Sequence, residues 1–276
     1  MKNFILNADD FGMSEDFNRA VLKGYEFGIL KSASLCANGV AFDDAVSSVI
    51  PKCQNLSVGV HLNIIEGKSL GNFPLLTDEN GNFNNGYLEI MKKSLDNEFL
   101  KQTEGEFRLQ IEKIKSKMRV DHIDSHVHTH AIPNLFKIVV KLAEEYEIPY
   151  IRTQFEHPYI VPNKMFNMIY PANVLKIILL NTFTLLNRRV LKNTSLKTND
   201  YLIGVGFTGM MDSKTIENGL KVLRGDFLAE ALIHPCDYET KDNHYTEFLI
   251  TQDIELKNKI EKMGIEVVNH NYITGG

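Results

Sequence analysis

The stretch Phe4-Ile5-Leu6-Asn7-Ala8-Asp9-Asp10-Phe11-Gly12 joins an apolar run to two adjacent carboxylates. The run predicts a first strand, and its acids lie at the C-terminal edge, where α/β folds keep their chemistry. Neighbouring strand residues point to opposite faces, so the acids can divide their roles only if the chain turns there, one reaching a metal and the other a water. The alternative, which this stretch alone favours, is an Asx turn or acids that offset the dipole of the next helix.

Outward from this stretch, strand and helix patterns alternate to the end of the chain. Ser14 can cap a first helix that ends at Gly28. Strands are expected at residues 4–6, 32–37, 56–61, 120–126, 149–152, 201–207, 229–234 and 265–269. Eight strand candidates alternating with helices, including one over 41–49, predict a (β/α) barrel that is TIM-barrel-like with room for irregularity. A Gly- and Asn-rich long loop is expected over residues 65–95, where it can shape a binding site.

Length and composition narrow the class of protein. One barrel of roughly 250 residues accommodates a chain of 276, so we expect a single domain over residues 1–276. A formal charge of -5 argues against nucleic acid as a partner. Cys36, Cys53 and Cys236 are widely spaced and form no CxxC pair, which suggests neither a disulfide framework nor a thiolate zinc site and fits a reducing compartment. The N-terminus lacks a leader pattern, so a cytoplasmic location is expected.

The most apolar stretch runs from Val174 to Leu186 and is interrupted by Lys176 and Asn181. It is shorter than the roughly 20 residues that cross a bilayer, so no membrane span is expected. We interpret it as a buried or interface helix, with a lid over an apolar substrate as the alternative. The sequence leaves the oligomeric state open, with a homodimer among the options.

Three later segments place a histidine where an apolar strand ends, namely His61, His126 and His234. A barrel brings such strand ends to one face. His61 alone would be taken for a core or turn histidine. If the fourth strand persists, His126, His128 and His130 share one face and crowd their charges, which favours metal binding there. Two neutral imidazoles and a carboxylate are a common divalent-metal set with open positions for water and substrate.

Four elements together resemble the YdjC-like family of carbohydrate deacetylases, whose best-known activity is on chito-oligosaccharides. They are Asn7-Ala8-Asp9-Asp10-Phe11-Gly12, His61 after a Gly-x pair, Asp124-Ser125-His126-x-His128-x-His130, and His234-Pro235. The resemblance spans nearly the whole chain, although residues 155–200 match no recognised pattern. It implies a fold similar to the metal-dependent polysaccharide deacetylases.

The resemblance also implies a role for each matching residue. Asp10, His61 and His126 would hold one divalent metal, Asp9 would be the general base and His234 the general acid. Further roles concern residues around this set. Arg152 could restrain Asp9 through a bidentate pair, and a surface ion pair is its equally weighted alternative. His128 and His130 are expected around the ligands or at the substrate, because three bound histidines plus Asp10 would fill a tetrahedral site.

The implied reaction is hydrolysis of an N-acetyl group on an amino sugar. The family is usually described with Mg²⁺, whereas two histidines beside one carboxylate suit Zn²⁺ or a similar ion better. One rival is a metal-dependent amidohydrolase or phosphoesterase barrel, since His126-x-His128 imitates their His-x-His pair, but that pair belongs on the first strand. The other rival is a non-catalytic sugar-binding protein, which the presence of both a base and an acid candidate disfavours.

Overall fold

Strand β1 (Lys2–Phe11) lies at the centre of a seven-stranded sheet in the computed structural model. The structure describes residues 1–164, 166, 170–238 and 242–275. β1 pairs along one edge with β6 (Phe227–Ile233), and its other edge is shared by β2 (Ser32–Leu35) and β7 (Glu266–Val268). All these pairs are parallel, so the C-terminal ends of the strands meet at one face.

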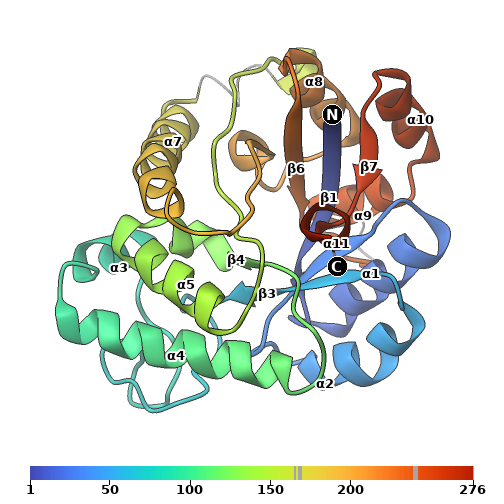
Figure 1. The fold of residues 1–276 in the computed structure, drawn as a ribbon. Helices are drawn as coiled ribbons and strands as arrows, with labels where there is room; N and C mark the ends of the chain where they lie inside the picture. The colour runs from blue at the N-terminus through green and yellow to red at the C-terminus, as the bar shows by residue number, and fades with distance from the viewer. Residues whose placement is uncertain (165, 167–169, 239–241, 276) are drawn as a thin grey trace.

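The sheet curls into an irregular (β/α) barrel, as predicted (Figure 1). The strand order is β4-β3-β2-β1-β6-β5, with β3 at Ser57–Leu62, β4 at Ile123–Ser125 and β5 at Tyr201–Ile203. An extended segment joins the two ends: the Arg152 N–H donates to the Ile123 carbonyl at 3.0 Å, and the Leu202 N–H to the Phe155 carbonyl at 2.8 Å. The strand predicted at 149–152 belongs to this segment and forms only two isolated bridges, from Ile151 to Ile123 and from Tyr150 to Lys197. It starts at a proline, which has no N–H to donate to a ladder.

Helices surround the sheet, and several begin at side-chain caps. As predicted, Ser14 caps α1 by accepting from the Phe17 N–H at 3.4 Å, and Gly28 follows the last residue of the helix as its C-cap. The helices are α1 (Glu15–Phe27), α2 (Phe42–Asp44), α3 (Tyr87–Lys93), α4 (Asn97–Lys115), α5 (Pro133–Glu145), α7 (Pro171–Leu191), α8 (Ser213–Val222), α9 (Asn243–Thr251), α10 (Ile254–Lys262) and α11 (His270–Thr274). Shorter turns are the π-turn η1 (Ala45–Val49) and the 3₁₀ turns η2 (Ile50–Lys52), η3 (His126–Ala131), η4 (Pro162–Lys164) and η5 (Val205–Phe207).

Further expectations about secondary structure are wrong, and the strand predicted over 201–207 ends at Ile203, before the turn η5. The loop predicted over 65–95 contains α3, which starts after Gly86. The fourth strand, predicted to His126, ends at Ser125, because Val127 and His128 adopt left-handed backbone conformations with φ of 49° and 59°. Left-handed residues cannot continue a β-ladder. His126, His128 and His130 therefore do not share one strand face.

The helix predicted over 174–186 is α7, and one of its faces is buried. Ile177, Leu180, Thr184 and Asn187 recur at helical spacing along that face. No helix in the described part of the chain has the length and apolar content needed to cross a membrane.

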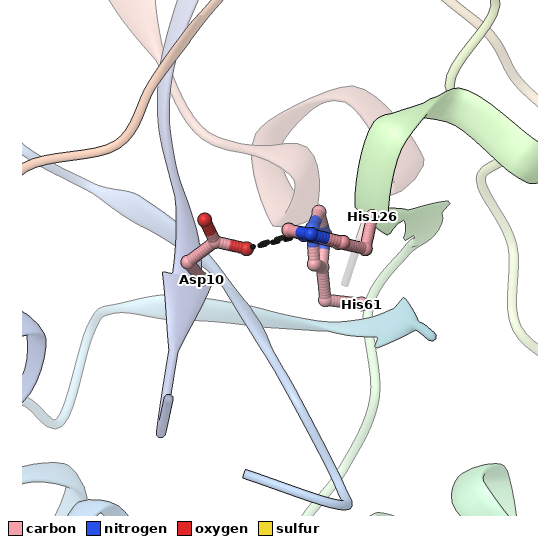
Figure 2. A group of neighbouring side chains, drawn as sticks. All are labelled: Asp10, His61 and His126. Atoms are coloured by element: carbon pink, nitrogen blue, oxygen red, sulfur yellow. Dashed lines mark hydrogen bonds and ion pairs between the residues drawn. The ribbon is translucent and has the colours of Figure 1, made fainter. Parts of the chain in front are cut away.

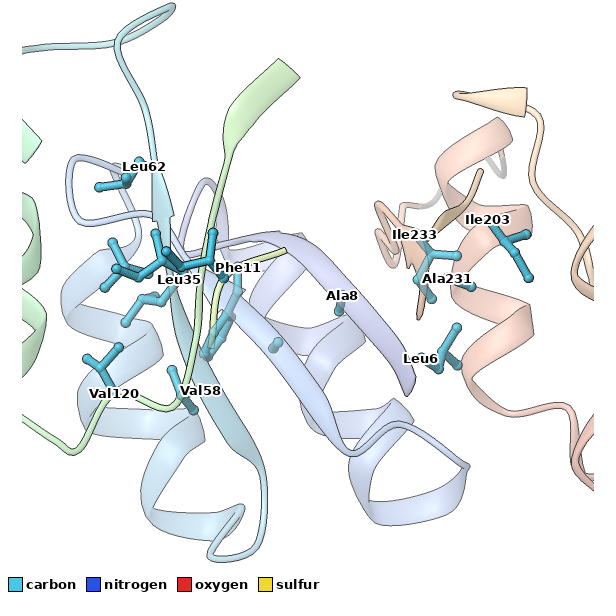
Figure 3. Packing of buried hydrophobic residues seen from close by; sticks show 14 of the residues in the cluster. Leu6, Ala8, Phe11, Leu35, Val58, Leu62, Val120, Ile203, Ala231 and Ile233 are labelled. Carbon is cyan, nitrogen blue, oxygen red and sulfur yellow. The ribbon is translucent and has the colours of Figure 1, made fainter. Parts of the chain in front are cut away.

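The main hydrophobic core lies between the sheet and the helices (Figure 3). On β1 the alternate residues Phe4, Leu6 and Ala8 belong to this cluster. By the period of two along a strand, Asn7 and Asp9 point the other way, into the barrel. The barrel interior is thus lined with buried polar side chains at its C-terminal end, which is where the site lies.

Candidate metal and catalytic site

A break in β1 separates the two adjacent acids. The register of β1 against β2 shifts between Ala8 and Phe11, and Asp10 has a φ of 62° within that break. Asp9 follows the strand alternation and points into the barrel, whereas the backbone at Asp10 departs from strand geometry. The chain therefore turns where the first interpretation of this stretch requires.

Asp10, His61 and His126 come together from the ends of three strands (Figure 2). The Asp10 Oδ1 atom lies 2.9 Å from His126 Nδ1 and 3.3 Å from His61 Nε2. One ligand atom of each residue lies within 4.8 Å of the other two. Two imidazole nitrogens and one carboxylate oxygen at this spacing suit a divalent transition ion and leave coordination positions open.

The far ring nitrogen of His61 is held by a buried carboxylate. Its Nδ1 lies 2.7 Å from Asp124 Oδ1, which directs Nε2 at Asp10. Metal-binding histidines commonly have such a carboxylate partner. Burial disfavours a charged ring here, but Asp124 and Asp10 outweigh it and raise the pKa of His61 to about 10. Negative charge is therefore in excess at this point, and a bound cation would offset it.

Arg152 is fully buried and contacts the carboxylates around these residues. Its Nη1 and Nη2 donate to the two carboxylate oxygens of Asp9 at 2.7 Å each. Nη2 also lies 2.7 Å from Asp124 Oδ2, and Nε donates to Glu230 Oε1 at 2.7 Å. The surface ion pair considered for Arg152 is therefore wrong, and the bidentate contact to Asp9 is present.

A second group of potential ligands, Asp9, His61 and Asp124, overlaps the first. The Arg152 guanidinium already contacts both of its carboxylates. A divalent cation placed there would be repelled by that fixed positive charge. The group around Asp10 is accordingly the better metal site.

His128 and His130 do not reach Asp10. His130 is buried, with Nδ1 2.5 Å from Ser125 Oγ and Nε2 3.0 Å from the Arg152 carbonyl oxygen. Burial lowers its pKa to about 4, so its ring is neutral near pH 7. His128 lines the pocket described below, and burial also lowers its pKa. His130 thus supports the segment that carries Arg152, while His128 faces the space above the site.

His234 follows β6 and is fixed by α9. Its backbone N–H donates to Glu247 Oε2 at 2.5 Å, and its ring Nδ1 lies 3.3 Å from the same oxygen. Burial disfavours the charged ring, but Glu247 and the carboxylate of Asp10 outweigh it and raise the pKa of His234 to about 9. A protonated imidazole at neutral pH is therefore available at the site.

Asp9, Asp10, His126 and His234 line a pocket of about 510 Å³, a size typical of small-molecule sites. α7 contributes one wall through Lys176, Leu179 and Leu180. The other lining residues are Asp9, Asp10, Tyr87, Ser125, His126, Val127, His128, Thr208, Gly209, His234 and His244. The pocket therefore combines apolar walls with the candidate base, the candidate acid and two of the three candidate metal ligands, Asp10 and His126.

Several site residues escaped the sequence analysis. Asp124 stood inside a quoted motif without a role of its own, and Glu230 and Glu247 were not singled out. For Glu230 a signal existed, because it is the only charged residue of the apolar strand Phe227–Ile233. A lone acid in a buried strand requires a buried partner. Glu247 lies on α9, whose pattern was not recognised.

Comparisons with known proteins point to one family. The model of the YdjC-like protein family matches residues 3–262. A carbohydrate deacetylase of Brevibacillus brevis is 36% identical over 147 residues, which are 52% of this chain and 57% of that protein. A carbohydrate deacetylase of Clostridium beijerinckii is 37% identical over 147 residues, 52% of this chain and 58% of that protein. The chain thus spans little more than half the length of these curated relatives.

A solved structure shares the fold. The crystal structure of a proposed cellobiose-phosphate cleavage protein from Enterococcus faecalis V583 matches 99% of this chain and 99% of its own with a TM-score of 0.72. The sequence identity is 23%, so this likeness concerns the architecture alone.

Proposed function

The chain belongs to the YdjC-like protein family, and on this premise we propose that it is a metal-dependent hydrolase that removes the N-acetyl group from an amino sugar, with chito-oligosaccharides as the leading substrate class. Its relatives from Brevibacillus brevis and Clostridium beijerinckii are named carbohydrate deacetylases, which supports this class of reaction. Two observations carry the proposal together: Asp9, Asp10, His126 and His234 line one pocket, and His61 joins Asp10 and His126 in one group of potential metal ligands.

Asp10, His61 and His126 are the proposed metal ligands. A divalent ion bound there would polarise the acetyl carbonyl and make a bound water more acidic. The donor set suits Zn²⁺ or Mn²⁺ better than Mg²⁺, which prefers oxygen. The carboxylate of Asp124 would keep the His61 ring in the orientation that presents Nε2.

Asp9 is the proposed general base. Burial disfavours its charge, but the Arg152 guanidinium outweighs this and holds the pKa of Asp9 well below its ordinary value, so the group is ionised. Its Oδ1 accepts from Arg152 and from Asn7 Nδ2 at 2.7 Å, and its Oδ2 accepts from Arg152. A carboxylate has about four acceptor positions, so Oδ2 keeps one for a water in the pocket.

His234 is the proposed general acid. An amide nitrogen must gain a proton to leave, because a free amide anion is a very poor leaving group. With its pKa raised to about 9, His234 carries that proton at neutral pH. The acid comes from the end of β6 and the base from the end of β1, two strands that pair directly. Both Asp9 and His234 line the same pocket, which supports this division of roles.

Acetate release tests the proposal. Protein stripped of metal with a chelator and reloaded with Zn²⁺, Mn²⁺ or Mg²⁺ should release acetate from N-acetylated chitobiose or chitotriose, and the stripped protein should not. A protein that binds these sugars and releases no acetate with any of the three ions would be a sugar-binding module. Cleavage of an N-carbamoyl or phosphate ester substrate instead would favour the amidohydrolase or phosphoesterase reading.

A further inference from the structure

Each histidine of the proposed metal site has a carboxylate facing the ring nitrogen that points away from Asp10. For His61 this is Asp124, at 2.7 Å from Nδ1. For His126 the nitrogen near Asp10 is Nδ1, and its Nε2 lies 3.9 Å from Glu66 Oε1. The two pairs differ in burial, since Asp124 is inaccessible and the Glu66 side chain is 53% exposed.

The backbone that carries Glu66 is held by two asparagines. Asn63 Oδ1 accepts from the Ile65 N–H at 2.9 Å and from the Glu66 N–H at 3.2 Å. The amide groups of Asn63 and Asn38 both donate to the Glu66 carbonyl, at 3.0 and 3.1 Å. Gly67 follows with a φ of +78°, and a Cβ there would lie 3.3 Å from Asn38 Nδ2. The loop is therefore fixed at the residue that faces His126.

One of these two asparagines, Asn63, also connects the loop to the strand that supplies His61. Asn63 is fully buried, and its N–H donates to Gln110 Oε1 at 2.9 Å while Gln110 Nε2 donates to the Asn63 carbonyl at 2.6 Å. Gln110 belongs to α4 and also donates to Glu106 Oε1 at 2.7 Å. The end of β3 thus positions both the ligand His61 and, five residues later, the carboxylate of Glu66.

We propose that Glu66 is a positioning residue for His126, and that it strengthens metal binding through the His126 Nε2–H group. This inference rests on the proposed metal site. A carboxylate at the far nitrogen orients the ring and makes the ligating nitrogen a better donor. The present 3.9 Å is longer than a hydrogen bond, but an exposed glutamate changes rotamer freely and can close that gap when His126 carries a cation on Nδ1.

Zn²⁺ affinity is the test, because it is read without any turnover. Zn²⁺ alone is titrated into the full chain in competition with a chelating dye. We expect Glu66→Ala to raise the dissociation constant for Zn²⁺ by about 10-fold. This is the lower end of the 10–100-fold typical of such partners, because the Glu66 side chain is half exposed. Glu66→Gln keeps an acceptor without the charge and should lie between Ala and wild type. Glu79→Ala removes an exposed carboxylate from the same loop and should leave the affinity unchanged.

The outcomes separate this inference from the proposed function. Unchanged Zn²⁺ affinity in Glu66→Ala overturns the positioning role, and if KM for the acetylated sugar rises instead, Glu66 contacts substrate. A loss as large as that of Asp10→Asn makes Glu66 a direct ligand and also overturns it. A wild-type protein that binds Zn²⁺ and releases no acetate contradicts the deacetylase proposal alone. A wild-type protein that binds no Zn²⁺ contradicts both.

Discussion

Arg152 contacts both carboxylate oxygens of Asp9, each through a different terminal nitrogen at 2.7 Å. The same guanidinium also contacts Asp124 and Glu230, so one buried cation is shared by three buried carboxylates. With Asp10 nearby, negative charge in this part of the barrel exceeds what Arg152 alone can offset. We therefore expect the protein to need Arg152 for its stability and Asp10 to attract a further cation.

The first prediction concerns the stability that Arg152 provides. Arg152→Met leaves buried carboxylates without their partner, and we expect a loss of about 3–5 kcal/mol in the free energy of unfolding. Urea denaturation followed by circular dichroism measures it. Arg108→Met is the matched control, because Arg108 pairs with Glu104 and Glu145 near the surface and should cost at most about 1 kcal/mol. Equal losses in the two variants would mean that the buried cluster contributes no more than a surface pair.

The second prediction divides the adjacent acids. Asp9→Asn should retain metal and lose deacetylation by roughly 10²–10⁴-fold, because an amide cannot take up the proton. The fold should tolerate this change, since Arg152 keeps Asp124 and Glu230. Asp10→Asn should lose the bound metal, and its loss of activity should follow from that. Measuring metal content and acetate release on the same preparations decides the matter, and equal metal loss in both variants would show that the division is wrong.

The order of strands and helices around these acids was largely predictable from sequence. The apolar run before Asp9, the Ser14 cap and the recurring strand patterns are local signals, and local signals give the barrel. The segment at 149–152 was predicted as a strand because its composition is strand-like. Its single bridges depend on how the barrel closes, which is a property of distant segments.

The third prediction is that one divalent ion binds per chain at Asp10, His61 and His126. Elemental analysis of wild type should give one ion per chain, and His61→Ala and His126→Ala should each abolish this content. His157→Ala is the control, because His157 is an exposed histidine with no place in the group. A zinc-loaded structure should show ligand atoms roughly 2.0–2.3 Å from the ion. A metal site that lacks either histidine would contradict the assignment.

The histidine-rich segment shows where sequence patterns stop being informative. Alternation placed His126, His128 and His130 on one face, but that holds only while the backbone stays extended. Val127 adopts a left-handed conformation, which a β-branched residue rarely does, and no propensity would suggest it. The resulting turn directs His126 to Asp10 and leaves His130 in contact with the Arg152 carbonyl oxygen. Strain at a candidate site is therefore the reason that the periodicity fails.

The fourth prediction follows from that strain. Val127→Asn should raise the free energy of unfolding by about 1 kcal/mol, because asparagine tolerates the left-handed region and Val127, half exposed, loses little packing. Urea denaturation measures the change. Val40→Asn is the control, since Val40 is exposed and is not among the residues with positive φ. A gain in both variants would mean that replacing an exposed valine by a polar residue stabilises the protein, and that backbone strain is not the cause.

The fifth prediction concerns the protonation state of His234. Its pKa is raised, so the imidazolium is present at neutral pH and is lost as pH rises toward about 9. If His234 is the general acid, turnover should fall along that alkaline limb, and bound metal charge would move the limb to lower pH. Glu247→Gln removes the carboxylate that stabilises the imidazolium and should shift the limb to lower pH as well. Rates of acetate release across pH 5–10 measure both shifts.

The acid role itself is tested by changing the leaving group. His234→Ala should slow hydrolysis of the N-acetyl amide by roughly 10²–10⁴-fold and remove the alkaline limb. An activated acetate ester, whose leaving group needs little protonation, should lose far less rate in the same variant. Metal content has to stay at the wild-type level for this comparison to hold. If amide and ester lose rate equally with metal still bound, His234 stabilises negative charge on the acetyl oxygen or positions the sugar, and the proton for the departing amine comes from elsewhere.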